Sequence, residues 1–205
     1  VLQANANLMI RTLFLLLGFA VFTDQGARFG DTTLAANHIL LQFISFSAFF
    51  LDGFAFTCES LAGKALGRRN RPLFLSVVAR TTWLAAGTGI ILATAIMLFG
   101  PALLTVLTDL PAVNSTALNY LPYCAFYVAI SFAAFQLDGL FIGTTTTAPL
   151  RNASILATSA FLLLIASLTP AWGNAGLWSA FIGFVCLRAL FLGAYFRHLL
   201  RPLAA

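Results

Sequence analysis

The sequence predicts an all-α integral membrane protein with six transmembrane helices. Of its 205 residues, 60% are hydrophobic and only 8% are charged, whereas a soluble domain carries roughly 25% charged residues. The apolar residues form long continuous runs, and a helix needs roughly 20 of them to cross a bilayer. Strands are disfavoured because the runs do not alternate with polar residues, as they would in a membrane barrel.

The expected helices end at recognisable breaks. They cover, in chain order, residues 8–26, 34–62, 73–100, 117–143, 150–169 and 177–197, and together form one transmembrane lobe spanning residues 1–205. A polar, glycine-containing segment closes the first helix and a basic segment closes the second. Gly100 and Pro101 weaken the end of the third helix, because both residues interrupt helices.

The later breaks have similar turn chemistry. The segment Asn114-Ser115-Thr116 supplies a helix start for the fourth run, and Pro122 within that run predicts a kink because it removes one backbone donor. Arg151 marks the break before the fifth helix. Pro170 and the Gly173-Asn174 pair separate the fifth helix from the sixth.

Loop charges predict the orientation of these helices. The second gap carries four cations that we interpret as topology anchors: Lys64, Arg68, Arg69 and Arg71. The fourth gap contains Arg151, and the tail contains Arg197 and Arg201. The other gaps hold one cation, Arg28, among acidic residues. By the positive-inside rule both ends are cytoplasmic, in a cell inner (plasma) membrane or, alternatively, a plastid envelope. Arg11, Arg80 and Arg188 are expected to extend toward the nearest membrane surface.

Acidic residues within the second helix need a different explanation. Reading back from Glu59 in steps of seven gives Asp52, Ser45 and His38, which share one helix face, and Gln42 lies beside them. A second polar stripe on the fourth helix contains Tyr127, Ser131 and Asp138. A buried carboxylate is costly unless it is paired or hydrated. The two stripes are therefore predicted to face each other or a shared aqueous cavity.

Structural roles remain open for the same residues. Glu59 lies close enough in sequence to pair with Lys64 or Arg68, and Asp52 could hydrogen-bond a neighbouring helix. A purely structural role is also open for Asp138. The three cysteines lie singly in apolar segments and are read as buried hydrophobic residues. The sequence has no paired His and Cys spacing for a metal and no phosphate-binding glycine loop.

Other functional classes find little support. The net charge of +5 does not predict nucleic-acid binding, because the cations are not gathered on an amphipathic element. No serine is followed by glycine, so the nucleophile motif of six-helix membrane serine proteases is missing. The acids at positions 52 and 138 do not match two-aspartate membrane proteases. The sequence therefore predicts that this chain is not an enzyme.

Three segments resemble the multidrug and toxic compound extrusion (MATE) family, and its DinF-like branch in particular. They are GDTTLAANHILLQ at 30–42, FFLDGFAFTCESLAGKALGRRN at 49–70 and FQLDGLFIGTTTTAPLRNA at 135–153. The resemblance covers nearly the whole chain in order. It implies the carboxy-terminal six-helix lobe of a 6+6 transporter, whose amino-terminal lobe is missing here. The chain accordingly opens with Val rather than Met.

The resemblance also implies an activity: export of organic, often cationic compounds by antiport with H⁺ or Na⁺, with no other cofactor. It assigns a cation-linked carboxylate to Asp138. The sodium-coupled branch also uses a glutamate in the first of these helices and a tyrosine one turn before the aspartate. Here the first run has no acid at mid-depth and position 134 is Ala, which speaks against a sodium site of that kind.

The expected mechanism is competition between a proton and a cationic substrate for one carboxylate, with Phe and Tyr faces holding flat cations. Two rival interpretations remain. The chain could be a self-contained six-helix protein that functions as a homodimer, or a flippase for lipid-linked or polysaccharide substrates. A flippase for such substrates is expected to have more cations in its cavity, whereas we interpret the charges within these spans as mostly acidic.

Overall fold

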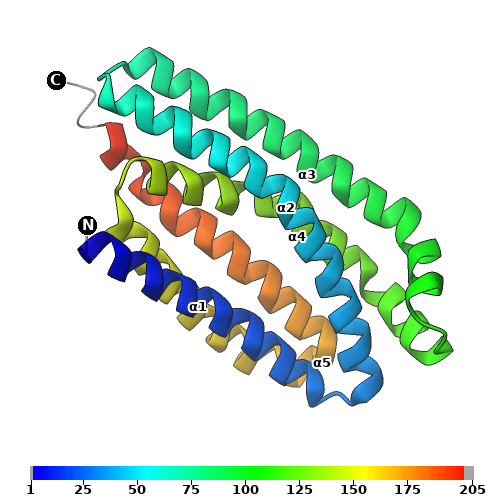
Figure 1. The fold of residues 1–205 in the computed structure, drawn as a ribbon. Helices are drawn as coiled ribbons and strands as arrows, with labels where there is room; N and C mark the ends of the chain where they lie inside the picture. The colour runs from blue at the N-terminus through cyan, green and yellow to red at the C-terminus, as the bar shows by residue number, and fades with distance from the viewer. Residues whose placement is uncertain (1, 201–205) are drawn as a thin grey trace.

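A computed structural model describes residues 2–200, and every element in that range is a helix. The elements are α1 (Leu2–Ala27), α2 (Asp31–Gly67), α3 (Arg71–Leu107), α4 (Pro111–Gly143) and α5 (Thr147–Leu200) (Figure 1). Each is long and apolar enough to cross a membrane, so the expectation of an all-helical membrane protein is confirmed. Arg201, one of the tail cations used to predict the orientation, lies outside the described residues.

The predicted count of six separate helices is not confirmed, because the last two expected spans form one element. Gly173 interrupts α5 with a backbone conformation of φ 55° and ψ −132°. The chain reverses there, and the second arm of α5 returns alongside the first (Figure 1). A Cβ atom on Gly176 would collide with the backbone at Leu168. The two arms therefore come together immediately after the reversal, and no loop is needed between them.

Two of the boundaries that differ from expectation involve prolines. Helix α3 does not end at Gly100 but continues through Pro101 to Leu107, since proline is tolerated inside membrane helices where the freed backbone groups find other partners. Helix α4 begins at Pro111 rather than after Asn114. Proline suits the first turn of a helix, because its missing N–H would have no partner there.

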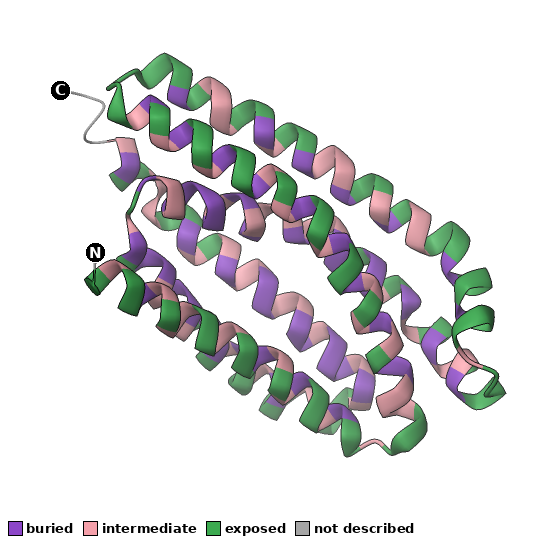
Figure 2. Cartoon of the chain, in the orientation of Figure 1, coloured by how far each residue is buried: buried purple, intermediate pink, exposed green. Residues whose placement is uncertain are grey.

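Helix α4 lies at the centre of the bundle. It packs against α2, α3 and α5, whereas α1 packs against α5 and α2. In its most apolar stretch 56% of the residues are buried, compared with 17% in α1 and in α3. The outer faces of α1 and α3 are largely exposed (Figure 2) and carry large apolar side chains such as Trp83 and Val106. Such faces suit contact with lipid or with another apolar protein surface.

Glycines bring the backbones of α2 and α4 into direct contact. A Cβ atom on Gly139 would collide with the backbone of Ala55, and one on Gly143 would collide with the backbone of Glu59. Small residues allow this close approach between membrane helices. The contact fixes the second helix against the segment that carries Asp138, and so brings the two predicted polar stripes together.

A buried polar cluster fastens α2 to the reversal in α5. The side chains of Asn37 and Asn174 exchange hydrogen bonds of 2.8 and 3.0 Å, and Trp178 Nε1 donates to Asn37 Oδ1 at 3.0 Å. Because all three are buried, this cluster holds the end of the bundle opposite to both described termini (Figure 1). The four cations at positions 64–71 lie at the other end, at the turn between α2 and α3.

Candidate functional site

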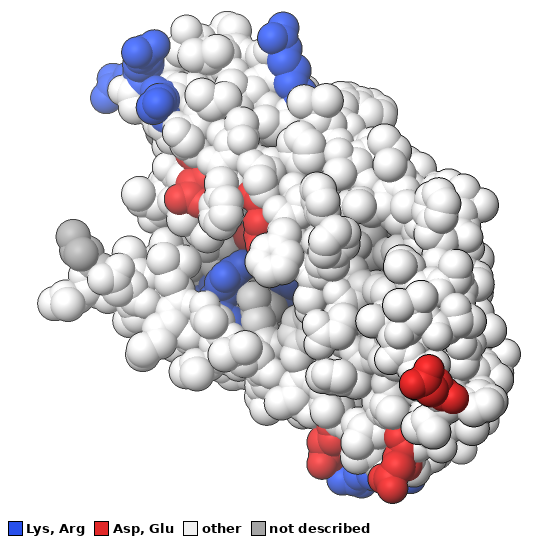
Figure 3. Space-filling view, turned by 45° about the vertical axis from the view of Figure 1, so that its right-hand side comes forward, with Lys and Arg blue, Asp and Glu red and all other residues white. Residues whose placement is uncertain are grey.

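A cavity of about 360 Å³ opens between α1, α2, α4 and the second arm of α5. The surface around it is mostly uncharged, and charged groups of both signs gather inside the hollow (Figure 3). Its charged lining residues are Arg11, Asp52, Glu59, Asp138 and Arg188. Its volume is in the range of small-molecule sites.

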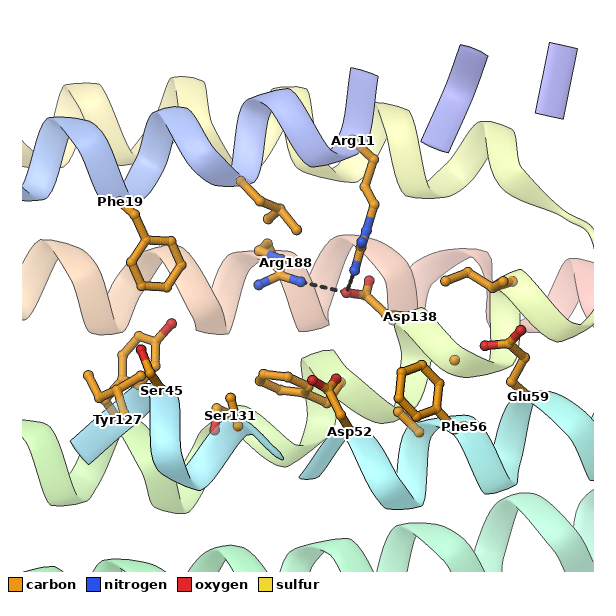
Figure 4. A pocket seen from close by; sticks show the side chains of 17 residues that line it. Arg11, Phe19, Ser45, Asp52, Phe56, Glu59, Tyr127, Ser131, Asp138 and Arg188 are labelled. Atoms are coloured by element: carbon orange, nitrogen blue, oxygen red, sulfur yellow. Dashed lines mark hydrogen bonds and ion pairs between the residues drawn. The ribbon is translucent and has the colours of Figure 1, made fainter. Parts of the chain in front are cut away.

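Asp138 lies at the centre of this cavity and binds two arginines. Arg188, from the second arm of α5, donates from Nη2 to Oδ2 of Asp138 at 2.6 Å, and Arg11, from α1, donates to the same oxygen (Figure 4). Asp138 and Arg188 are each 7% exposed. Arg188 also lies against the Phe184 ring, with Cζ 5.9 Å from its centroid.

The expectation that Arg11 and Arg188 extend to the membrane surface is wrong. Both turn inward instead, because a carboxylate within reach compensates a buried cation better than an apolar stretch of helix can. Asp138, for which the resemblance implies a cation-linked role, has its Oδ2 atom held by these two guanidinium groups.

The α2 side of the cavity carries the other two acids. Asp52 and Glu59 are half-buried and project from the wall opposite to α1 (Figure 4). Among residues 2–200 neither carboxylate forms an ion pair. The alternative in which Glu59 pairs with Lys64 or Arg68 is therefore not seen, and both carboxylates are free to meet a ligand.

Aromatic side chains complete the cavity. Tyr127 is almost fully buried, and its ring stacks on that of Phe181 with centroids 4.6 Å apart and planes 10° from parallel. Phe19, Phe56 and Phe135 also contribute to the lining. Such rings can pack against a flat apolar ligand and attract a cation to their faces.

The two polar stripes meet in this one cavity, except for His38 and Gln42 at the start of the α2 stripe. Ser45, Asp52 and Glu59 line it from α2, and Tyr127, Ser131 and Asp138 line it from α4. Gln42 is not among the lining residues; it is exposed and lies 3.3 Å from His38. Ten residues from Asp52, it is turned about 80° away from that side chain around the helix.

Sequence reasoning missed Arg11 and Arg188 as site residues. The available signal was the presence of two cations inside apolar runs that also contained acids, and we interpreted each cation by itself. The structure corrects the inferred charge balance as well. Three carboxylates face two guanidinium groups in the cavity, so acidic groups predominate by a single formal charge. Among residues 2–200, no group of three His, Cys, Asp or Glu side chains is arranged to hold a metal.

Fold and cavity together define a helical membrane protein with a charged pocket between its helices. Comparison with known families identifies the family of this protein. The model of the MatE family matches residues 8–168, and the chain belongs to that family. The expected family is thereby confirmed. The family's solved members are transporters rather than enzymes, in agreement with the lack of a catalytic motif.

Two curated relatives extend the match. The chain is 32% identical over 197 residues to "DNA damage-inducible protein F" of Escherichia coli, which covers 96% of this chain and 43% of that protein. It is 28% identical over 200 residues to "Protein DETOXIFICATION 44, chloroplastic" of Arabidopsis thaliana, covering 95% and 37% respectively. The chain thus spans less than half the length of the curated relatives that it matches.

Solved structures share the fold at low sequence identity. A MATE protein in a bent conformation superposes with a TM-score of 0.85 at 15% identity, covering 95% of this chain and 44% of that one. A multidrug resistance MATE family transporter in an outward-facing conformation gives 0.79 at 16%, covering 95% and 44%. A MOP superfamily transporter from Pyrococcus furiosus, described as having a binding pocket of reverse polarity, gives 0.78 at 16%, covering 95% and 43%.

Proposed function

We propose that this chain is one lobe of a two-lobed secondary transporter, which exports amphipathic organic compounds, cationic ones among them, by antiport with H⁺ or Na⁺. The missing lobe is the amino-terminal half of the same protein. The transporter would work in the cell inner membrane, with both described ends on the cytoplasmic side. It would need no cofactor other than the coupling ion.

The observation that carries this proposal is the pair of unpaired carboxylates in the cavity. Asp52 and Glu59 line an aromatic pocket and have no ion-pair partner in the described chain. A carboxylate of this kind can hold either a proton or a cationic ligand, and competition between the two couples their movements. We assign the exchangeable role to Asp52 rather than Asp138, because Asp138 is already occupied by two arginines.

Efflux of ethidium, a planar aromatic cation, tests the proposal. The intact protein is reconstituted in vesicles, and efflux is driven by an imposed pH gradient or an imposed Na⁺ gradient. Asp52→Asn should lower efflux about tenfold, since a charge-assisted contact contributes roughly 1.5–3 kcal/mol. Asp24→Asn is the matched control, because Asp24 is exposed and lies outside the cavity, in a surface pair with Arg28.

Two outcomes would contradict the proposal. Unchanged efflux by Asp52→Asn under both gradients would remove this carboxylate from the coupling step. A native polypeptide mass near 22.0 kDa, rather than about twice that value, would replace the two-lobed protein by an assembly of separate six-span chains.

A flippase for lipid-linked or polysaccharide substrates is the second candidate function. Arg11 and Arg188 in the cavity wall favour it, because a lipid-linked substrate carries phosphate groups that arginine binds well. Translocation of a lipid-linked phosphate by the reconstituted protein, without ethidium efflux, would select this function over drug export.

A further inference from the structure

Two guanidinium groups converge on a single oxygen in the cavity. Arg11 and Arg188 both donate from Nη2 to Oδ2 of Asp138 (Figure 4). An arginine side chain carries five N–H donors, and within residues 2–200 neither side chain donates to any other protein acceptor. Nε of Arg11 is buried without a partner. Most of the donor capacity of this pair is therefore not used by acceptors within residues 2–200, and both side chains line the cavity.

The charges of this cluster are also unbalanced. Two guanidinium groups and one carboxylate leave one positive charge, and Arg188 is nine-tenths buried. The remaining acids, Asp52 and Glu59, project from the opposite wall and are not paired with either arginine. The cavity therefore has a cationic side formed by α1 and α5 and an anionic side formed by α2.

We propose that Arg11 and Arg188 form an anion subsite, which binds the carboxylate of an aromatic amphiphile that also carries a cationic group. The planar guanidinium fork matches a carboxylate in two-point geometry. Asp138 competes for the same donors and holds them in place while the subsite is empty. The role of this ligand as transported cargo rests on the proposed function; its binding does not.

The opposite wall argues for a singly charged carboxylate rather than a phosphate-rich headgroup. Asp52 and Glu59 would attract a cationic group on the same molecule, whereas they would repel a ligand with several negative charges. Phe19 and Tyr127 also line the cavity, toward one end of it (Figure 4), and their rings suit a flat aromatic body. The cavity of about 360 Å³ fits a molecule of small-drug size.

Two dyes that differ by one methyl group test the subsite. Rhodamine 110 carries a free carboxylate, and rhodamine 123 is its methyl ester and has only the positive charge. Fluorescence polarisation would measure their binding to the intact protein in phosphatidylcholine nanodiscs. Arg188→Gln and Arg11→Gln should each weaken rhodamine 110 binding about tenfold, the effect of one charge-assisted contact. Rhodamine 123 binding should stay within about twofold, and its retention shows that the variants are folded.

Arg80→Gln is the matched control, because Arg80 is exposed on α3 and does not line the cavity. Asp138→Asn gives a result in the opposite direction. This substitution weakens the acceptor that competes with the ligand, so it should strengthen rhodamine 110 binding. If Asp138 had only a structural role, the same substitution would weaken the binding of both dyes.

The proposal is overturned if wild-type protein fails to bind rhodamine 110, or if the arginine variants weaken both dyes equally or neither. Loss of rhodamine 110 binding in phosphatidylglycerol nanodiscs would assign the subsite to a lipid headgroup and so overturn the amphiphile assignment. Because binding is measured without an ion gradient, selective binding without any efflux would refute the proposed transport activity and leave the anion subsite standing.

Discussion

Arg188 and Asp138, fifty positions apart in the sequence, form a buried ion pair in which Nη2 donates to Oδ2 at 2.6 Å. The pair joins the second arm of α5 to α4, and Arg11 adds α1 through the same carboxylate oxygen. One acceptor atom therefore fixes three helical segments around the cavity. Loss of this ion pair should therefore lower the stability of the bundle.

A double-mutant cycle measures this coupling. Arg188→Gln and Asp138→Asn should each lower the free energy of unfolding by about 1–3 kcal/mol, because each removes the charge-assisted contact between two buried side chains. The double variant should lose less than the sum of the two, with a coupling energy of at least roughly 1 kcal/mol. Thermal or denaturant unfolding of purified protein in detergent provides the values. Strict additivity would show that the two residues do not stabilise each other.

The glycine contact between α2 and α4 gives a second prediction. Gly139→Ala places a methyl group against the backbone of Ala55 and should destabilise the protein by about 1–3 kcal/mol, as overpacking does. Gly87→Ala is the control, since nothing lies within 4 Å of the added carbon and the helix should gain roughly 0.5–1 kcal/mol. Equal melting temperatures for the two variants would show that α2 and α4 are not in backbone contact.

The polar cluster at Asn37 gives a third prediction. Asn37→Leu leaves the buried amide of Asn174 and the indole N–H of Trp178 without their partner. The free energy of unfolding should fall by about 2–4 kcal/mol, since an unmade buried hydrogen bond costs about 1–3 kcal/mol. Tryptophan fluorescence should report the change, because Trp178 belongs to the cluster.

Gln42→Ala is a suitable comparison for that variant. Gln42 lies on the same helix, but it is exposed, and its side-chain hydrogen-bond partner within residues 2–200 is His38, so its replacement should change stability by no more than about 0.5 kcal/mol. It should also leave ethidium efflux unchanged, because the side chain does not line the cavity. A strong efflux defect in Gln42→Ala would show that Gln42 does take part in the functional site.

Several features of the fold could be predicted because they depend on local composition. The long apolar runs predict membrane helices, because a chain segment in lipid must hydrogen-bond its own backbone polar groups. The seven-residue spacing of Ser45, Asp52 and Glu59 places them on one helix face, and the structure brings that face to the cavity. The three quoted segments predict the family, which the comparison confirms for residues 8–168.

Other features depend on which helix lies beside which. The spacing of Asp138 places it on a face, but not beside Arg11 and Arg188, which lie on α1 and α5. A cation within an apolar run can turn outward to the membrane surface or inward to an acid, and the choice depends on the distance to a partner on another helix. The reversal at Gly173 also depends on tertiary packing. A glycine permits a positive φ, but it does not by itself require a hairpin of two long helical arms.

The sequence by itself thus determined a helical membrane protein of the MatE family, with carboxylates on two helix faces. Periodicity and hydropathy act along a single chain segment, so they can be read without knowing its neighbours. Only the tertiary structure decided that Asp138 binds two arginines, that Asp52 and Glu59 have no ion-pair partner within residues 2–200, and that the cavity has a cationic and an anionic side. A charge-assisted hydrogen bond forms only when its two atoms lie about 3 Å apart, so the pairing is settled by how the helices pack.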